Sequence, residues 1–231
     1  MTALGFAHRG APHAGVRENT LAAFRTAVAE GADALESDVW VTADGVPVLD
    51  HDGALGGWVR KLLHRRTTIG TVTRAALPGW LPSLADYYRE IGTALPLSLD
   101  VKGPDAADAT IAVAREAGAA PRLWLCGDVS ELPRWRALDA DVRLVDSTRR
   151  ANLGEAVAAR AARIAGVGGQ ALNMKVREWS RSDVDAAHAA GVLAFGWDAH
   201  TSAAVRHARA LGLDGVYGDS VRALALLREK D

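Results

Sequence analysis

The sequence predicts an α/β protein, a (β/α)8 TIM barrel with a short insertion after the second strand, on three observations. Short apolar segments alternate with longer, Ala-rich amphipathic segments along the whole chain. About eight such alternations fit into 231 residues, a count that favours a closed barrel over an open doubly wound sheet. Polar residues recur where the apolar segments end, and barrel active sites gather at the C-terminal ends of the strands.

The expected strands are the short apolar segments. They cover residues 4–7, 34–41, 97–101, 122–126, 142–145, 171–174, 192–197 and 215–217. The expected helices cover residues 20–30, 84–91, 106–117, 131–137, 153–165, 182–190, 202–211 and 221–229. Thr20 and Ser182 suit the N-caps of two of these helices. Glycines that favour a left-handed C-terminal cap follow four of the expected helices, at Gly31, Gly118, Gly191 and Gly212.

Residues 53–83 break this rhythm and form the expected insertion. Long loops on the catalytic face of a barrel usually have a function, so we expect a lip or small lid with Trp58 and Trp80 as apolar contacts. For the basic patch at 60–66, a solvated loop is the alternative. We see no repeat period and no linker, so residues 1–231 are expected to form a single domain.

Composition limits the classes of partner. The net charge of -1 gives no electrostatic case for nucleic acid or an anionic membrane surface, so any phosphate binding must be local. The one cysteine, Cys126, excludes an internal disulfide and a thiolate zinc site of its own, and we expect it to be buried. Without a basic leader or an apolar run near the roughly 20 residues that cross a bilayer, a cytoplasmic location with no stable membrane anchoring is expected.

Residues 34–52 hold two carboxylates and a histidine that we expect in one place. Glu36 and Asp38 are two residues apart on an expected strand, so they share one face. Like charges this close call for a divalent cation, a shared proton or an Arg or Lys partner. A turn at 43–45 then returns the chain and brings His51 towards the carboxylates. The alternative is a strand end with an ion pair and a surface histidine.

Asp100 and Lys102 likewise share one face of the third expected strand. Asp100 therefore suits a third carboxylate beside Glu36 and Asp38. Three carboxylates with waters favour a hard cation, Mg²⁺ or Ca²⁺, over zinc. The alternative is a simple Asp100–Lys102 ion pair.

Chemically useful residues also end the first, seventh and eighth expected strands. His8 and Arg9 follow the first strand, where an imidazole and a guanidinium together can exchange protons and hold an anionic oxygen. Trp197 and Asp219 end the seventh and eighth. The remaining histidines are expected to be surface or structural residues: His13, His64, His188, His200 and His207.

These residues stand in motifs that resemble the glycerophosphodiester phosphodiesterase family, in order and spacing, nearly from end to end. The motifs are H-R-G at 8–10, E-N-T at 18–20, G-A-D-A-L-E-S-D-V at 31–39, T-A-D-G-V-P-V-L-D-H-D at 42–52, R-T-T at 66–68, L-P-S-L at 81–84, L-S-L-D-V-K at 97–102, G-W at 196–197 and G-L-D-G-V-Y-G-D at 212–219.

The resemblance implies metal-dependent hydrolysis of a small glycerophosphodiester to glycerol 3-phosphate and an alcohol. The cofactor would be one divalent cation, Mg²⁺ or Ca²⁺, with Mn²⁺ a third candidate. A lysophospholipase D or phosphoinositide phospholipase would use the same barrel with a larger apolar entrance. A barrel that only binds a phosphodiester is the non-catalytic alternative.

The resemblance also implies a role for each candidate site residue. The metal ligands would be Glu36, Asp38 and Asp100. His8 and His51 would be the acid/base pair: one takes the proton from the attacking oxygen and the other protonates the leaving alkoxide. The phosphate, and the charge that develops on it, would be held by Arg9 and Lys102, with Trp197 an apolar wall of the pocket.

The sequence departs from the family's pattern in three places. Asp100 stands where the family usually has Glu, which is one methylene longer. Arg17 replaces a Pro before E-N-T, and G-D-S-V at 218–221 replaces T-D-x-P. The last change leaves Asp219 readable as the N-cap of the final helix.

Overall fold

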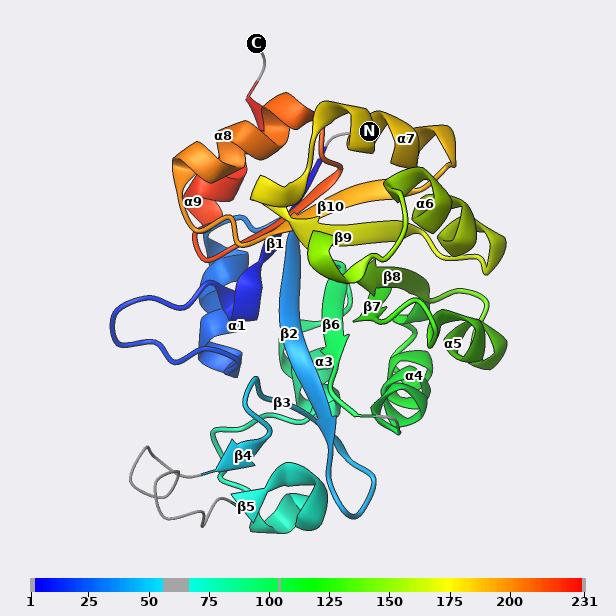
Figure 1. Ribbon diagram of the computed structural model, residues 1–231. Helices are drawn as coiled ribbons and strands as arrows, with labels where there is room; N and C mark the ends of the chain where they lie inside the picture. Colours follow the sequence, from blue (N-terminus) through cyan, green and yellow to red (C-terminus); the bar gives the residue numbers. More distant parts are fainter. Residues whose placement is uncertain (1–2, 56–66, 104, 230–231) are drawn as a thin grey trace.

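Eight parallel strands form a closed ring in the computed structural model, which describes residues 3–55, 67–103 and 105–229 (Figure 1). Neighbouring strands pair in chain order, and β1 pairs with both β2 and β11, which closes the ring. The strands are β1 (Leu4–Ala7), β2 (Ala34–Val41), β6 (Leu97–Val101), β7 (Leu123–Gly127), β8 (Arg143–Ser147), β9 (Ala171–Lys175), β10 (Leu193–Trp197) and β11 (Gly215–Gly218). The predicted (β/α)8 barrel is confirmed.

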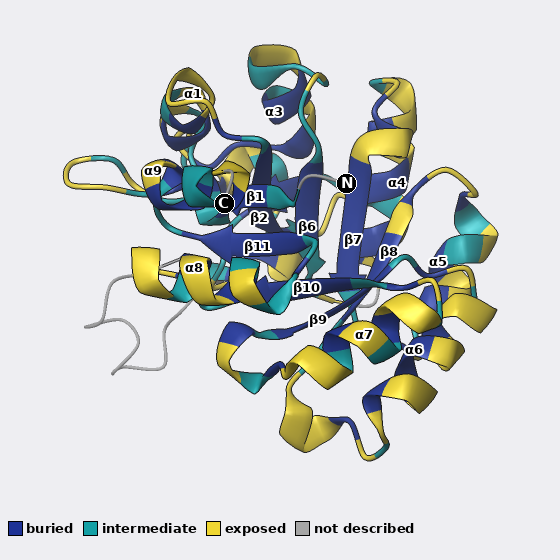
Figure 2. Ribbon diagram, turned by 90° about the horizontal axis from the view of Figure 1, so that it is seen from above, coloured by how far each residue is buried: buried dark blue, intermediate teal, exposed yellow. Residues whose placement is uncertain are grey.

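Helices connect the strands and cover the outside of the ring. Their outward faces are exposed, whereas the strands are largely buried (Figure 2). None of the helices in the described ranges is both long and apolar enough to cross a membrane. The helices are α1 (Leu21–Ala29), α3 (Leu84–Ile91), α4 (Ala106–Glu116), α5 (Leu132–Leu138), α6 (Val157–Gly166), α7 (Arg181–Ala189), α8 (Ser202–Leu211) and α9 (Val221–Leu224).

Two expected helices are shorter than their sequence patterns. The helix expected at 153–165 begins at Val157, because Gly154 takes a left-handed backbone conformation (φ 64°) that interrupts the pattern. The helix expected at 221–229 is an α-helix only over α9, and a 3-10 turn follows at Ala225–Arg228. Thr20 caps α1 as expected, since its hydroxyl accepts a hydrogen bond from the Ala23 N–H.

The expected N-cap at Ser182 is wrong. Ser180 caps α7 instead, and Ser182 lies inside the helix. The Ser180 hydroxyl accepts from the backbone N–H of Asp183, while the Asp183 carboxylate accepts from the backbone N–H of Ser180. This reciprocal pair satisfies two backbone donors at once, so it places the helix start at Ser180 rather than at Ser182.

The inside of the ring changes from apolar to polar along the strands. An apolar cluster fills its deeper part, where Phe6 stacks on Tyr217 with ring centroids 4.6 Å apart. Two residues further along a strand, the same inward face carries polar groups: Glu36 follows Ala34, for example. The cluster consists of Phe6, Ala34, Trp124, Cys126, Val145, Ala171, Phe195 and Tyr217. The expected burial of Cys126 is confirmed.

The segment after β2 folds back on it before the next helix begins. The short strand β3 (Pro47–Leu49) pairs antiparallel with β2. The two-residue strands β4 (Ala54–Leu55) and β5 (Thr67–Thr68) then pair with each other. Gly53, with φ 64°, lies so close to Trp40 that a Cβ would be 2.3 Å from its ring, so only glycine fits there.

The structure describes only part of the segment expected to form the lip. Trp80 is 40% exposed, and the Arg17 guanidinium lies 3.5 Å from its ring centroid. Trp58 and the basic patch at 60–66 lie outside the described residues.

Candidate active site

A cavity of about 360 Å³ opens at the C-terminal ends of the barrel strands. It brings together all eight side chains that the sequence assigns to the site. They come from five places in the chain: the turn after β1, strand β2, the segment after β3, the end of β6 and the end of β10. The lining residues are His8, Arg9, Glu36, Asp38, His51, Asp100, Lys102, Ser147, Arg149, Asn173, Trp197 and Tyr217.

The three carboxylates occupy neighbouring strands. Asp38 and Asp100 are direct partners in the parallel pairing of β2 with β6, and Glu36 lies two residues before Asp38 on the same face. Glu36 and Asp38 are buried, at 5% and 3% exposure. Burial raises the pKa of Glu36 to about 8, with a smaller push from the Asp38 and Asp100 charges against the opposing effect of His8. Burial and the Asp100 charge likewise raise the pKa of Asp38.

Arg9 reaches this carboxylate pair through its backbone and its side chain. The residue adopts a left-handed conformation (φ 51°), and its backbone N–H donates to Glu36 Oε2 at 2.8 Å. Its guanidinium donates to the Glu18 carboxylate at 3.1 Å, and Nε lies 3.7 Å from Asp38 Oδ2. The H-R-G and E-N-T motifs therefore meet through the Arg9–Glu18 pair.

Lys102 bridges two of the carboxylates. Its Nζ lies 3.1 Å from Asp38 Oδ1 and 3.1 Å from Asp100 Oδ2. The Asp100–Lys102 ion pair considered as an alternative is thus present, but it extends to Asp38. Burial works against the ammonium charge, yet the two carboxylates outweigh it and raise the pKa of Lys102, which remains a cation at neutral pH.

The two histidines of the predicted acid/base pair have different surroundings. His51 follows β3 and is half-buried, with Nδ1 3.0 Å from Asp52 Oδ1. His8 follows β1, with Nδ1 2.6 Å from Asp219 Oδ1 and Nε2 4.0 Å from Glu36 Oε2. Burial lowers the pKa of His8, but the Asp219 hydrogen bond and the Glu36 charge outweigh it, so the net shift is upward.

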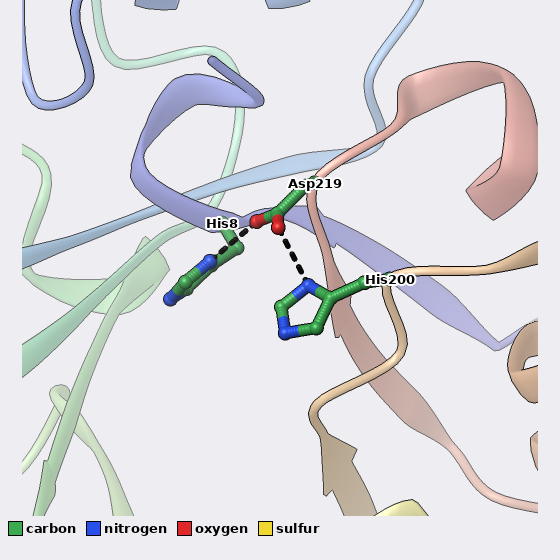
Figure 3. Close-up of side chains that lie close together, drawn as sticks. All are labelled: His8, His200 and Asp219. Carbon is green, nitrogen blue, oxygen red and sulfur yellow. Dashed lines mark hydrogen bonds and ion pairs between the residues drawn. The ribbon is translucent and has the colours of Figure 1, made fainter. Parts of the chain in front are cut away.

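Asp219 corrects an expectation. Ser220, not Asp219, caps α9, because the Ser220 hydroxyl accepts from the Ala223 N–H. Asp219 lies between the imidazoles of His8 and His200 instead, with Oδ2 2.6 Å from Nδ1 of His200 (Figure 3). His200 is exposed, which agrees with the surface or structural histidine expected there. Asp219 follows Tyr217 by two residues, so strand alternation continues its inward direction.

Four further lining residues escaped the sequence reasoning: Ser147, Arg149, Asn173 and Tyr217. Ser147 and Asn173 lie on the adjacent strands β8 and β9, where the Asn173 amide donates to the Ser147 hydroxyl at 3.1 Å. The alternation of side chains along a strand, which indicated the direction of Glu36, also applies to Ser147 and Asn173. A single neutral polar side chain on a strand is, however, only weak evidence for a functional site. Arg149 lies 5.5 Å from the Trp197 ring centroid, so the expected apolar wall also carries a cation.

The carboxylate side of the cavity has the chemistry of a hard-cation site. Asp38 Oδ2 is buried without a hydrogen-bond partner among the described residues, and burial raises the pKa of Glu36 despite the cationic neighbours, so a further positive charge would stabilise both carboxylates. Oxygen-only donors fit Mg²⁺, Ca²⁺ or Mn²⁺.

A second group also lies close enough for its side chains to share an ion. The ligand atoms of His8, His200 and Asp219 lie within 4.8 Å of one another, the one such group in the part of the chain that the structure describes. The three carboxylates do not approach so closely, and Lys102 bridges two of them.

Comparison with known proteins finds similarity in sequence over part of the chain and in fold over nearly all of it. The sequence model of the glycerophosphoryl diester phosphodiesterase family matches residues 8–81. Glycerophosphodiester phosphodiesterase 1 of Bos taurus is 48% identical over 65 residues, which are 28% of this chain and 17% of that protein. The probable glycerophosphodiester phosphodiesterase 2 of Mycobacterium tuberculosis is 34% identical over 146 residues, covering 58% of this chain and 52% of that protein. The chain thus spans about half the length, or less, of these curated relatives.

Solved structures share the fold over almost the whole chain. A glycerophosphodiester phosphodiesterase from Thermotoga maritima superposes with a TM-score of 0.80 at 22% identity, covering 99% of this chain and 98% of that chain. A phosphodiesterase from Oleispira antarctica, in complex with the product sn-glycerol-3-phosphate, superposes with a TM-score of 0.82 at 20% identity, covering 99% and 98%. The chain is therefore similar to the glycerophosphoryl diester phosphodiesterase family in sequence over residues 8–81, and it shares the barrel fold of these structures over almost its whole length.

Proposed function

We propose that this chain hydrolyses glycerophosphodiesters to glycerol 3-phosphate and an alcohol, using one divalent cation. The observation that carries the proposal is the convergence of three carboxylates, two histidines and two cationic side chains on one cavity. The names of the relatives support it, as does the glycerol 3-phosphate bound to the Oleispira antarctica phosphodiesterase.

Glu36, Asp38 and Asp100 would hold the cation, since they supply the oxygen donors of the site. A divalent cation bound there would withdraw charge from the phosphate and lower the pKa of a nearby hydroxyl or water. Asp100 is the most exposed ligand of the three and the only one at the cavity rim, at 37% side-chain exposure against 7% for Glu36 and 4% for Asp38.

Arg9 and Lys102 would bind the phosphate. Both already lie beside Asp38 in the cavity, so they can bind an anionic substrate without a cationic side chain having to move in from solvent. Arg9 offers a planar fork of N–H donors that matches two phosphate oxygens, while Lys102 acts as a point charge. Both would also offset the charge that develops on the phosphate in the transition state.

His8 and His51 would transfer protons, one from the attacking oxygen and one to the leaving alkoxide. They lie on the turn after β1 and on the segment after β3, so they approach the cavity from two different elements. His8 has the better-defined orientation, because Asp219 holds its Nδ1 while Nε2 faces Glu36.

The described walls favour a small polar diester over a lysophospholipid. Besides the aromatic side chains of Trp197 and Tyr217, the described lining is charged or polar. A lysophospholipase D or phosphoinositide phospholipase would need a larger apolar entrance.

We also propose that residues 53–83 are an insertion within a single domain. The cytoplasmic location stays a prediction.

The test is release of glycerol 3-phosphate from glycerophosphocholine and glycerophosphoethanolamine, beside choline release from lysophosphatidylcholine. His8→Ala and His51→Ala should each lower kcat by at least about 100-fold, the usual scale of a lost acid or base. His207→Ala, an exposed histidine of α8, is the matched control. Near wild-type turnover by His51→Ala would remove it from the pair. Activity on lysophosphatidylcholine alone would favour the lysophospholipase, and silence on every substrate the binding-only barrel.

A further inference from the structure

We propose that His200 is a positioning residue that acts on His8 through the Asp219 carboxylate. It would keep Asp219 in the orientation that holds the proton of His8 on Nδ1 and leaves Nε2 free for the cavity. The inference rests on the proposed function, in which His8 is one of the proton-transferring groups.

The contacts form one continuous chain (Figure 3). Asp219 accepts from His8 Nδ1 through Oδ1 and from His200 Nδ1 through Oδ2, each at 2.6 Å. An ionised carboxylate can only accept hydrogen bonds, so each imidazole must donate an Nδ1–H. Burial opposes the charge of Asp219, but the His8 hydrogen bond and nearby positive charge outweigh it and lower its pKa. With Nδ1 of His8 committed in this way, Nε2 is the nitrogen left to exchange protons in the cavity.

The other side of the His200 ring is held as well. Its Nε2 lies 3.0 Å from Asp198 Oδ1, and Asp198 Oδ2 accepts from Lys175 Nζ at 2.7 Å. Both nitrogens of His200 therefore face a carboxylate, which fixes the rotation of the ring although its side chain is 44% exposed.

The backbone places His200 against the end of β11. The buried Ala199 donates its N–H to the Tyr217 carbonyl at 3.2 Å, which docks the segment on the strand that carries Asp219. Gly218 permits this approach, because a Cβ there would lie 2.5 Å from the Ala199 carbonyl oxygen. Asp198 takes a left-handed conformation (φ 71°), which Asp tolerates better than most residues.

His200 does not line the cavity. Removing its imidazole would therefore leave the substrate contacts in place but free one oxygen of Asp219. The Asp219 carboxylate could then rotate, and the His8 ring would lose its fixed orientation. The expected signature is a fall in kcat with little change in KM.

The test compares three substitutions at one position. His200→Ala should lower kcat about 10-fold to 100-fold, the scale known for hydrogen-bond partners that orient metal-binding histidines. His200→Asn should recover most of that loss, because the Asn amide nitrogen occupies roughly the place of Nδ1 and can donate to Asp219. His200→Gln should have a kcat as low as that of His200→Ala, because the Gln amide nitrogen occupies roughly the place of Nε2 and therefore does not reach Asp219. His207→Ala again controls for loss of a histidine on this face.

Equal activity of all the variants, or Asn no better than Gln, would overturn the proposal. A rise in KM at unchanged kcat would also overturn it, since that pattern belongs to a substrate contact. If His200→Ala does not fold, the comparison of Asn with Gln still decides. The purified protein could instead bind a transition metal that the Ala and Asn variants lose. That result would make His8, His200 and Asp219 a metal site and would refute the positioning role of His200.

A readout independent of turnover separates this inference from the proposed function. Two-bond ¹H–¹⁵N spectra report which ring nitrogen of His8 carries the proton. We expect the Nδ1–H form in the wild type and in His200→Asn, and a mixture with the Nε2–H form in His200→Ala. An unchanged His8 signal in His200→Ala would overturn the positioning role even in a protein without activity on glycerophosphodiesters.

Discussion

Replacing Glu36 with glutamine should stabilise the metal-free protein while removing its function. The Glu36 carboxyl is buried beside two further carboxylates, and its pKa is raised to about 8. Glutamine keeps the size of the side chain and an oxygen that can accept from the Arg9 N–H, but it carries no charge. The substitution therefore removes the ionisable carboxyl group but keeps the shape of the side chain.

The magnitude follows from proton linkage. In the unfolded chain a glutamate titrates near its ordinary pKa of about 4.3. Between that value and about 8 the folded state holds a proton that the unfolded state has released, so the free energy of unfolding falls as pH rises through this window. Multiplying the distance of the pH from about 4.3 by about 1.4 kcal/mol per pH unit gives a penalty of about 1 kcal/mol at pH 5 and about 4 kcal/mol at pH 7. Glu36→Gln escapes this penalty.

The assay is urea unfolding with chelator at about pH 5 and about pH 7, followed by tryptophan fluorescence. Glu36→Gln should exceed the wild type in unfolding free energy, and by more at the higher pH. Excess Mg²⁺ or Mn²⁺ should narrow this difference, because cation at about 100 times its Kd adds about 2.7 kcal/mol to a protein that binds it when folded. Glu30→Gln, at an exposed position after α1, is the matched control.

A Glu36→Gln protein less stable than the wild type in chelator at about pH 7 would refute the reasoning. So would a gain that is the same at both pH values, since the effect must follow the titration of Glu36.

Three other outcomes are expected. Asp100→Asn should weaken Mn²⁺ binding by at least about tenfold and lower activity in parallel, and unchanged metal dependence would remove Asp100 from the ligand set. Burial raises the pKa of the Cys126 thiol, so a thiol reagent should modify it only in denaturant; labelling of the native protein would contradict its burial. Asp86→Asn should lower the unfolding free energy by about 1 kcal/mol at neutral pH, through loss of the α3 capping box with Ser83. Burial opposes its charge, but the Ser83 and Arg89 hydrogen bonds lower the pKa of Asp86 to about 2. This stabilisation is present above the ordinary pKa of about 4 and is lost as pH falls towards 2, so in urea unfolding the gap between wild type and variant should narrow there, and a constant gap would contradict it.

The barrel could be predicted because its signal is local and repeated. Each strand is a short apolar run, and each helix carries its own periodicity, so errors at single boundaries leave the order intact. The boundary errors have local causes as well. Gly154 interrupts a helical pattern by its left-handed backbone, and Ser180 outcompetes Ser182 because Asp183 completes its capping box.

The carboxylate side of the site could also be predicted from the sequence. Glu36 and Asp38 share a strand face by alternation, and the pairing of β2 with β6 sets Asp100 opposite Asp38. The role of His200 was not readable, because it depends on a loop that docks on β11 and on a partner 19 positions later in the chain. No local pattern marks such a contact, and an exposed histidine after a strand resembles any other surface residue.

The most direct test of the central claim is glycerol 3-phosphate release from a glycerophosphodiester by protein stripped with chelator and then given Mg²⁺, Ca²⁺ or Mn²⁺ one at a time. If the carboxylates of Glu36, Asp38 and Asp100 hold a catalytic cation, release should stop on stripping and return with at least one of these metals. Full activity in the stripped protein would contradict the metal site, and no release with any metal would contradict the proposed reaction.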